Sequence, residues 1–144
     1  MTQREEIVSS ARKYIGARWS HQARGDDKMD CAGLVIKVAN ELGYIDWDIT
    51  DYERQATDER MLRLCREHLI EIRRDQLQPG DLVVLAYGSN RHIGIIGDYP
   101  YGGLSLIHAQ AMHPRMVGEN RLDDDWLKMV GARIVGCFQF PEKL

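Results

Sequence analysis

The order of apolar and polar residues divides the chain into a helical first half and a strand-rich second half. In the first half, apolar residues recur at intervals of three and four, which is the spacing of an amphipathic helix. A first helix is expected to begin after an N-cap at Thr2 and to end at Gly16. A second is expected between an Asp30 N-cap and Gly43, and a third from about Thr57. The apolar positions that support these helices are Ile7, Val8, Ala11, Tyr14, Ile15, Leu34, Val35, Val38, Ala39, Leu42, Met61, Leu62, Cys65 and Leu69.

The period changes at Pro79-Gly80, after which short β-branched runs alternate with turn sequences. Strands are expected at residues 81–88, 91–99, 103–110, 115–122 and 132–140, without a helix between them. Helices followed by such a run of strands are typical of an α+β fold. We therefore expect N-terminal helices packed on one side of an antiparallel sheet of about five strands.

Length, charge and composition narrow the class of protein. A chain of 144 residues without a linker or repeat is expected to form one domain, residues 1–144. The formal net charge of −3 and the lack of a basic run exclude a nucleic-acid partner bound by charge. No apolar run approaches the roughly 20 residues of a membrane helix, so membrane insertion is not expected. The first residues lack the apolar core of a signal peptide, which predicts synthesis in the cytoplasm without export by that route.

One of the three cysteines occupies an unusual position. Their odd number and the lack of a CxxC pair argue against a disulfide scaffold. Cys65 lies on a helical apolar stripe and is expected in the core, while the nearby His68 is expected at a helix surface. Cys31 falls in the first turn of the second helix, where backbone N–H groups favour a thiolate and lower a cysteine pKa. The alternative is a small apolar residue at the end of a core helix.

Two histidines, His92 and His108, interrupt otherwise apolar strands. If these strands are neighbours, the two rings can lie side by side on one face of the sheet. With Cys31 they would supply a nucleophile, a base and a residue that orients the base, in that chain order. Two satisfied core histidines are the alternative reading. A zinc site of the same three residues is a further alternative, but closely spaced ligand pairs are absent, and neither a metal nor another cofactor is expected.

Five motifs follow one another in an order that resembles the NlpC-type cell-wall peptidases, a papain-like family of cysteine hydrolases. They are IGARW, DCAGLV, QPGDLVV, HIGIIG and LIHAQ, and the similarity runs from about Glu5 to Phe140. The chain is more similar still to stand-alone members encoded with phage tail genes and gene transfer agents. That similarity lies in SHQARGDDKMDC, DYERQATDERMLRLCREHL, RMVGENRLDDDW and ARIVGCFQFPE.

The resemblance implies roles for particular residues. It implies Cys31 as nucleophile, His92 as base and His108 as the third polar member. It also implies that the Cys31 backbone N–H helps to hold the oxyanion, a task suited to a helix N-terminus. The reaction would be attack on an amide of a peptidoglycan stem peptide, commonly between D-γ-glutamyl and a diamino acid. The acyl-enzyme would then be hydrolysed by water.

Two positions depart from the family pattern, and both bear on substrate binding. Trp19 stands where many relatives have a tyrosine near the nucleophile, and an indole N–H can donate but cannot accept a hydrogen bond. Ala32 replaces a serine that, with the aspartate equivalent to Asp30, binds the free amine of the stem peptide in relatives. His21 and Gln22 are expected either to contribute to substrate binding or to hold their loop.

Three functional hypotheses remain open from the sequence. The first is a cell-wall cysteine peptidase carried on a phage or prophage tail, with stem peptide as substrate and tail-tip proteins as possible partners. The second is a tail-tip or baseplate component whose main role is assembly. The third is an acyltransferase on the same fold, in which an amine or a lipid intercepts the acyl-enzyme instead of water.

Overall fold

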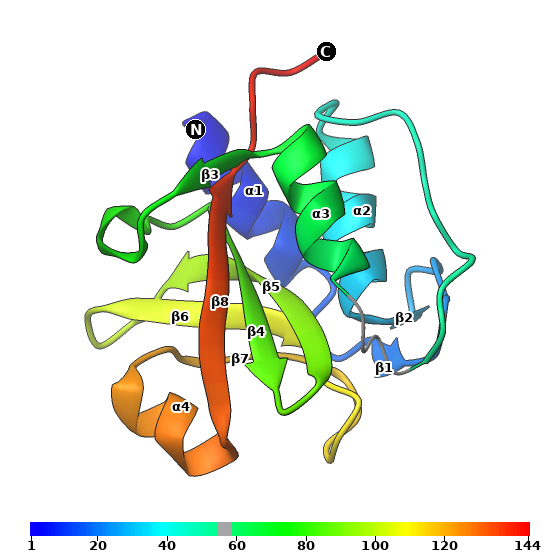
Figure 1. Ribbon diagram of the computed structural model, residues 1–144. Helices are drawn as coiled ribbons and strands as arrows, with labels where there is room; N and C mark the ends of the chain where they lie inside the picture. Colours follow the sequence, from blue (N-terminus) through cyan, green and yellow to red (C-terminus); the bar gives the residue numbers. More distant parts are fainter. Residues whose placement is uncertain (55–58) are drawn as a thin grey trace.

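Six strands form one antiparallel sheet in the computed structural model, which describes residues 1–54 and 59–144 (Figure 1). In spatial order the strands are β3 (Ile70–Ile72), β8 (Ala132–Gln139), β4 (Leu82–Tyr87), β5 (Asn90–Asp98), β6 (Leu104–Ala109) and β7 (Val117–Arg121). A separate parallel pair is formed by β1 (Arg18–Trp19) and β2 (Lys28–Met29). The α+β class is confirmed. The sheet has one strand more than the five expected, because the Ile-Glu-Ile alternation of β3 is only three residues long.

The helices are α1 (Gln3–Arg12), α2 (Cys31–Glu41), α3 (Arg60–His68) and α4 (Asp124–Val130). The expected N-caps of α1 and α2 are confirmed, since Thr2 accepts from the Glu5 N–H and Asp30 accepts from the Gly33 N–H. α1 ends four residues before the expected Gly16. The expected start of the third helix at Thr57 lies outside the described residues. None of the helices in the described ranges has the length and apolar character to cross a membrane.

α4 corrects the expectation that no helix interrupts the strands. Asp123 caps it by accepting from the Trp126 N–H at 2.8 Å, and Gly131 ends it with a φ of 72°. The segment is only seven residues long, so its apolar periodicity is too short to stand out beside the adjacent strands. The acidic cap and the terminal glycine were the available signals.

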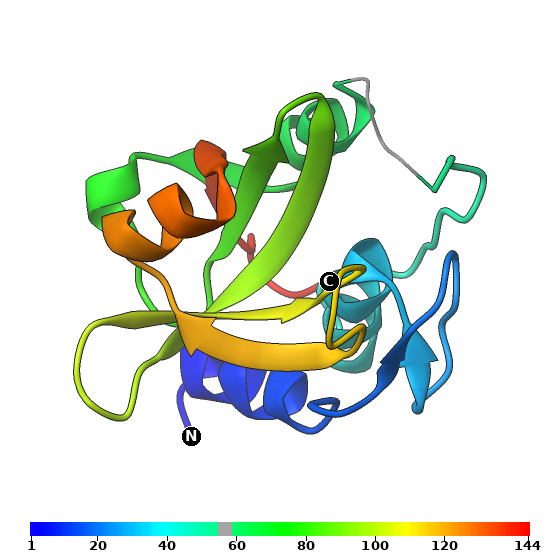
Figure 2. The ribbon, with the colours of Figure 1, turned by 90° about the horizontal axis from the view of Figure 1, so that it is seen from below.

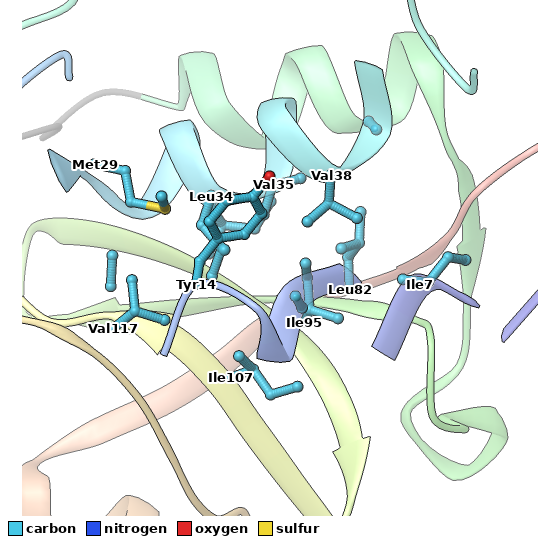
Figure 3. Packing of buried hydrophobic residues seen from close by; sticks show 14 of the residues in the cluster. Ile7, Tyr14, Met29, Leu34, Val35, Val38, Leu82, Ile95, Ile107 and Val117 are labelled. Carbon is cyan, nitrogen blue, oxygen red and sulfur yellow. The ribbon is translucent and has the colours of Figure 1, made fainter. Parts of the chain in front are cut away.

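Both faces of the sheet are buried. Successive residues of a strand point to opposite faces, so Leu82 and Val84 of β4 pack under α1 and α2, as do Ile95 and Ile107 (Figure 3). On the other face, Val83 and Leu85 belong to a second cluster. That cluster also contains Ile96, Leu106, Leu122, Leu127 and Cys137. Figure 2 shows α4 and α1 on opposite sides of the sheet. Coverage on both faces explains why DLVVLA reads as a continuous apolar run.

The sheet is strongly twisted, and β6 and β7 run across β4 and β8 in Figure 1. α2 packs on β5 and β6, so its N-terminal end meets the sheet where the two histidine-bearing strands lie side by side. Two other expectations for the helical region are confirmed. Cys65 is buried in the core, and His68 is exposed, with its ring against Trp47 at a centroid distance of 4.6 Å.

Candidate active site

The N-terminal end of α2 presents Cys31 toward the sheet. Asp30 has extended backbone angles and accepts the Gly33 N–H at 2.8 Å, so Cys31 is the first helical residue. Cys31 is partly exposed, whereas Cys65 and Cys137 are buried. Of the three cysteines, Cys31 is therefore the one with part of its surface open to solvent.

The resting state of Cys31 is a thiol. Burial raises the pKa of Cys31 to about 11, and this effect exceeds the lowering by the backbone N–H groups of Ile93, Ala32 and Cys31 itself. The expectation that the helix end lowers this pKa is wrong for the free site, because the loss of water outweighs the hydrogen bonds. The hydrogen bond from the Ile93 N–H also places the Cys31 sulfur against β5. Ile93 directly follows His92 in that strand. Such a thiol needs a base before it can act as a nucleophile.

The rings of His92 and His108 are in direct contact, as the strand pattern predicted. His92 Nε2 lies 2.8 Å from His108 Nδ1, and the ring centroids are 5.0 Å apart. Gly94 allows this approach between β5 and β6. A Cβ atom there would lie 2.6 Å from Leu106 Cδ1, 3.0 Å from the Ile107 carbonyl oxygen and 3.1 Å from His108 Cβ. The glycine after the histidine in HIGIIG is therefore required by the packing of the two strands.

Asn120 of β7 extends this pair and decides which ring nitrogens carry protons. Its Nδ2 donates to the Arg121 carbonyl at 2.9 Å, which turns Oδ1 toward His108 Nε2 at 2.6 Å. An amide oxygen can only accept, so His108 carries its proton on Nε2 and presents an unprotonated Nδ1. His92 must then donate from Nε2, and its lone pair lies on Nδ1.

Both imidazoles are held in the neutral form. Burial, and after it the nearby His108, lower the pKa of His92 to about 3. Burial also lowers the pKa of His108, against a smaller raising effect of the Asn120 hydrogen bond. Trp126 of α4 covers the edge of the His108 ring, with centroids 5.8 Å apart at 90°. At neutral pH, His92 is therefore an unprotonated base, and the Cys31 sulfur lies against the next residue of the same strand, Ile93.

Asp30 is the centre of a second polar network on the other side of the α2 N-terminus. Its Oδ1 accepts from the Gly33 N–H and from Arg24 Nη1 at 3.1 Å. Its Oδ2 accepts from the Gln22 N–H at 2.8 Å and from the Tyr52 hydroxyl at 2.5 Å. Both oxygens are thus occupied by donors of the chain itself. Asp30, a predicted substrate-binding residue, is 3% exposed and acts in this structure as a cap and an anchor.

The other predicted substrate-binding residues lie around this network. Gln22 donates from Nε2 to the Tyr52 carbonyl at 2.8 Å, which favours the loop-holding role for this side chain. His21 packs edge-on against the Tyr52 ring, with centroids 5.6 Å apart. Trp19 in β1 is partly buried beside the same core cluster as Cys31. Trp19 and His21 both keep part of their surface open to solvent.

Comparison with known proteins places this arrangement in a family. Residues 16–129 match the model of the NlpC/P60 family. The chain belongs to the NlpC/P60 family. Its similarity to this family therefore includes the segments that carry Cys31, His92, His108 and Asn120.

Individual NlpC/P60 relatives agree with this assignment. The chain is 31% identical over 105 residues to the probable endopeptidase p60 of Listeria grayi, a match over 72% of this chain and 17% of that protein. The fold is similar to NlpC1 from Trichomonas vaginalis, with a TM-score of 0.68 at 18% identity, over 97% of this chain and 45% of that chain. It is also similar to the NlpC/p60 domain of the peptidoglycan hydrolase SagA, with a TM-score of 0.61 at 19% identity, over 96% of this chain and all of that domain. This NlpC/P60 chain thus spans less than half of the first two relatives and the whole of an isolated family domain.

The residues of this NlpC/P60 site do not favour the zinc alternative. Both ring nitrogens of His108 already face other side chains, which leaves none for a metal. Within the described ranges, no group of three or more His, Cys, Asp or Glu side chains is arranged to hold a metal ion.

A cavity of about 420 Å³ lies on the outer side of α2, lined by residues such as Tyr14, Lys37 and Asp48, and it includes none of Cys31, His92 or His108.

Sequence reasoning did not single out three residues of these networks. Asn120 was seen only as part of the strand expected at residues 115–122, and its distance from the histidines along the chain gave no sign of contact. Tyr52 and Arg24 were polar residues in irregular segments. A polar residue in the strand next to the LIHAQ strand was the available signal for Asn120, because neighbouring strands share a face.

Proposed function

We propose that this NlpC/P60 domain is a cysteine peptidase that hydrolyses an amide bond in peptidoglycan stem peptides. The observation that carries the proposal is the hydrogen-bonded series from Asn120 through His108 to His92, which leaves a lone pair on His92 Nδ1 in the strand whose next residue, Ile93, hydrogen-bonds the Cys31 sulfur. A buried pair of neutral histidines without such a free nitrogen would fit a purely structural role. The Listeria grayi relative is named an endopeptidase and the SagA domain belongs to a peptidoglycan hydrolase, which supports the same substrate class.

The proposed first step forms the bond between sulfur and carbon. His92 Nδ1 takes the Cys31 proton while the sulfur attacks the amide carbonyl, so the thiolate need not exist in the resting enzyme. The developing oxyanion is held by backbone N–H groups at the start of α2, including that of Cys31. The tetrahedral intermediate then expels the amine, which receives its proton from the His92 imidazolium.

The proposed second step returns the enzyme to its starting state. Water attacks the thioester carbonyl and gives a proton to His92. The carbon–sulfur bond then breaks, Cys31 regains its proton, and the carboxylic acid leaves. His108 and Asn120 act through His92, since they hold its Nε2 as a donor and stabilise the imidazolium.

We propose the D-γ-glutamyl–diamino acid amide as the bond that is cleaved, on the strength of the family resemblance. The amine-binding pair of relatives is altered here, because Ala32 has no hydroxyl and both Asp30 oxygens are occupied. A free N-terminal amine on the substrate therefore finds few hydrogen-bond acceptors at this position and adds little to binding. Stem peptides whose first amine is already acylated are the substrates that this arrangement favours.

The test is mass spectrometry of purified peptidoglycan fragments incubated with the wild-type protein, Cys31→Ala and Cys65→Ala. We expect new stem-peptide fragments with wild type and with Cys65→Ala, and none with Cys31→Ala. The fragment masses identify the bond and distinguish hydrolysis from transfer to an added amine. If wild type leaves walls of several bacterial types intact, the peptidase proposal is refuted.

We propose further that the domain acts as part of a phage or prophage tail, with tail-tip proteins as partners. The resemblance of its loop before Cys31 and of its last hairpin to tail-encoded members supports this. Co-sedimentation of the protein with assembled tails tests it. A tail-bound Cys31→Ala protein that assembles normally would show that catalysis and assembly are separate roles.

A further inference from the structure

We propose that Arg54 and Arg115, which lie against the Trp19 ring, form a subsite for the free carboxylate of the glutamyl residue next to the bond that is cleaved. This inference rests on the proposed peptidase function, whose substrate it specifies. The Arg54 guanidinium carbon is 5.0 Å from the Trp19 ring centroid, and that of Arg115 is 5.6 Å away. The indole therefore holds both guanidinium groups close to its ring, and Trp19 is the residue that they share.

Trp19 is close to the nucleophile through the backbone. β1 pairs with β2 in parallel, with Trp19 opposite Met29, and the Ser20 N–H donates to the Met29 carbonyl at 3.2 Å. Cys31 follows Met29 by two residues and packs on the same core cluster as Trp19. The loop that carries Arg115 follows the His108 strand, and its Arg115 carbonyl accepts the Trp19 N–H at 2.8 Å. The Trp19 ring that both arginines contact thus belongs to a strand paired with the segment that leads into the start of α2.

Among residues 1–54 and 59–144, the charges of this cluster have no carboxylate partner. Arg54 and Arg115 are exposed and make no salt bridge with any residue in the described ranges. Arg18 and Lys28, which face each other across β1 and β2, are also exposed and unpaired there. By contrast, Arg4, Arg12, Arg24 and Arg91 each contact a carboxylate. In a chain with a net charge of −3, four cations without a carboxylate partner among the described residues therefore lie on β1 and β2 or against the Trp19 ring.

The carboxylates nearest to the cluster in sequence do not neutralise it. Asp27 and Glu53 precede Lys28 and Arg54, and both carboxylates are exposed. Neither makes an ion pair among the described residues. A pair of guanidinium groups held by an aromatic ring and left unpaired is suited to an anionic ligand, for which arginine offers two parallel N–H donors.

The proposed substrate supplies such an anion at the required place. An amide made through the γ-carboxyl of a glutamyl residue leaves the α-carboxyl free, four bonds from the carbonyl that Cys31 attacks. Amidation of that α-carboxyl removes its charge and one of its two acceptor oxygens. The subsite therefore predicts selectivity for the unamidated peptide over an otherwise identical amidated one.

The test compares binding of these two peptides to Cys31→Ala by isothermal titration calorimetry at neutral pH. We expect the unamidated peptide to bind about 10-fold more tightly, because a charge-assisted hydrogen bond contributes more than a neutral one. Adding Arg54→Gln and Arg115→Gln should remove this preference by weakening the unamidated peptide alone. Arg133→Gln, which deletes an exposed and unpaired charge on β8, is the matched control and should leave the preference intact.

The outcomes separate this proposal from the peptidase function. If wild type cleaves both peptides and the arginine variants lose affinity for both equally, or for neither, the carboxylate subsite is refuted while the peptidase stands. If wild type cleaves neither peptide, the peptidase function itself fails. Restored preference in Arg54→Lys and Arg115→Lys would show that the positive charge, and not the packing on Trp19, carries the selectivity.

Discussion

Two polar networks flank the start of α2, and they differ in what they leave unpaired. Around Asp30, every carboxylate oxygen has two donors, and the donors come from the loop before α2, from Gly33 of α2 and from Tyr52. Around His92, the hydrogen bonds are donated in one direction, from His92 to His108 and from His108 to Asn120, and His92 Nδ1 keeps a free lone pair. The network around Asp30 has no free acceptor and holds the loop segments in place. The network around His92 keeps one acceptor, Nδ1, available for chemistry.

The glycines of the two motifs serve these networks in the same way. At Gly33 a Cβ atom would lie 2.6 Å from the Ala23 carbonyl oxygen and 2.9 Å from Arg24 Nη1. At Gly94 it would lie against Leu106 and His108. Each glycine is needed because a polar group must approach the backbone closely. The comparison shows that a motif glycine can mark a structural network as well as a candidate catalytic one.

The largest expected effect is on the saturated network. Asp30→Ala removes a buried carboxylate that pairs with Arg24 and leaves three other donors without a partner, so we expect the free energy of unfolding to fall by about 3–5 kcal/mol. Urea denaturation measures this change. Asp26→Ala is the matched control, because Asp26 pairs with Lys37 from a largely exposed position and should cost at most about 1 kcal/mol. Equal losses in the two variants would contradict the structural role of Asp30.

A smaller effect in free-energy terms is expected at Asn120, and it is measured mainly as a loss of activity. Asn120→Ala should lower kcat/KM by about 10–100-fold, in the range found for residues that orient a functional group through another side chain. The free energy of unfolding should change by no more than about 1–2 kcal/mol, the range for one hydrogen bond. Peptide hydrolysis and urea denaturation together give both values.

Asn120→Asp separates orientation from simple packing. The carboxylate keeps an acceptor toward His108 Nε2 but adds a charge that favours an imidazolium. We expect much of the activity to return, with the acidic limb of the pH profile moved to higher pH. If Asp fails like Ala and the pH profile does not move, Asn120 does not act through His108.

The smallest expected effect, counted per pH unit, is the change in stability on acidification that the neutral histidines impose. The pKa of His92 is lowered to about 3 in the folded protein, so the unfolded chain binds a proton between the ordinary value near 6.5 and pH 3 while the folded protein does not. Stability should therefore be constant above about pH 6.5 and fall on acidification, by at most about 1.4 kcal/mol per pH unit for this group. Urea denaturation from pH 7.5 to 4.5 measures the slope. His92→Gln should be less sensitive to acid than wild type, and an identical slope in both would contradict a neutral buried His92.

The residues of the candidate site were open to prediction to different degrees. His92 and His108 stood out because each interrupts an apolar strand, and their contact followed once the strands were neighbours. Cys31 stood out through its Asp30 cap, although its pKa was predicted in the wrong direction. A helix end is visible in a sequence, but the loss of water around the sulfur depends on β5, which lies sixty residues away in the chain.

The sequence by itself determined the helices with clear caps, the main strands, the α+β class and the order of the family motifs, because these depend on local periodicity and on residues close together in the chain. The tertiary structure alone decided that α4 covers the second face, that Asp30 is saturated by Arg24 and Tyr52, and that Asn120 sets the protons of both imidazoles. The physical reason is that burial and hydrogen-bond saturation are properties of surroundings assembled from distant segments. The same side chain can be an anchor or a reactive group, and the partners that folding brings to it decide which.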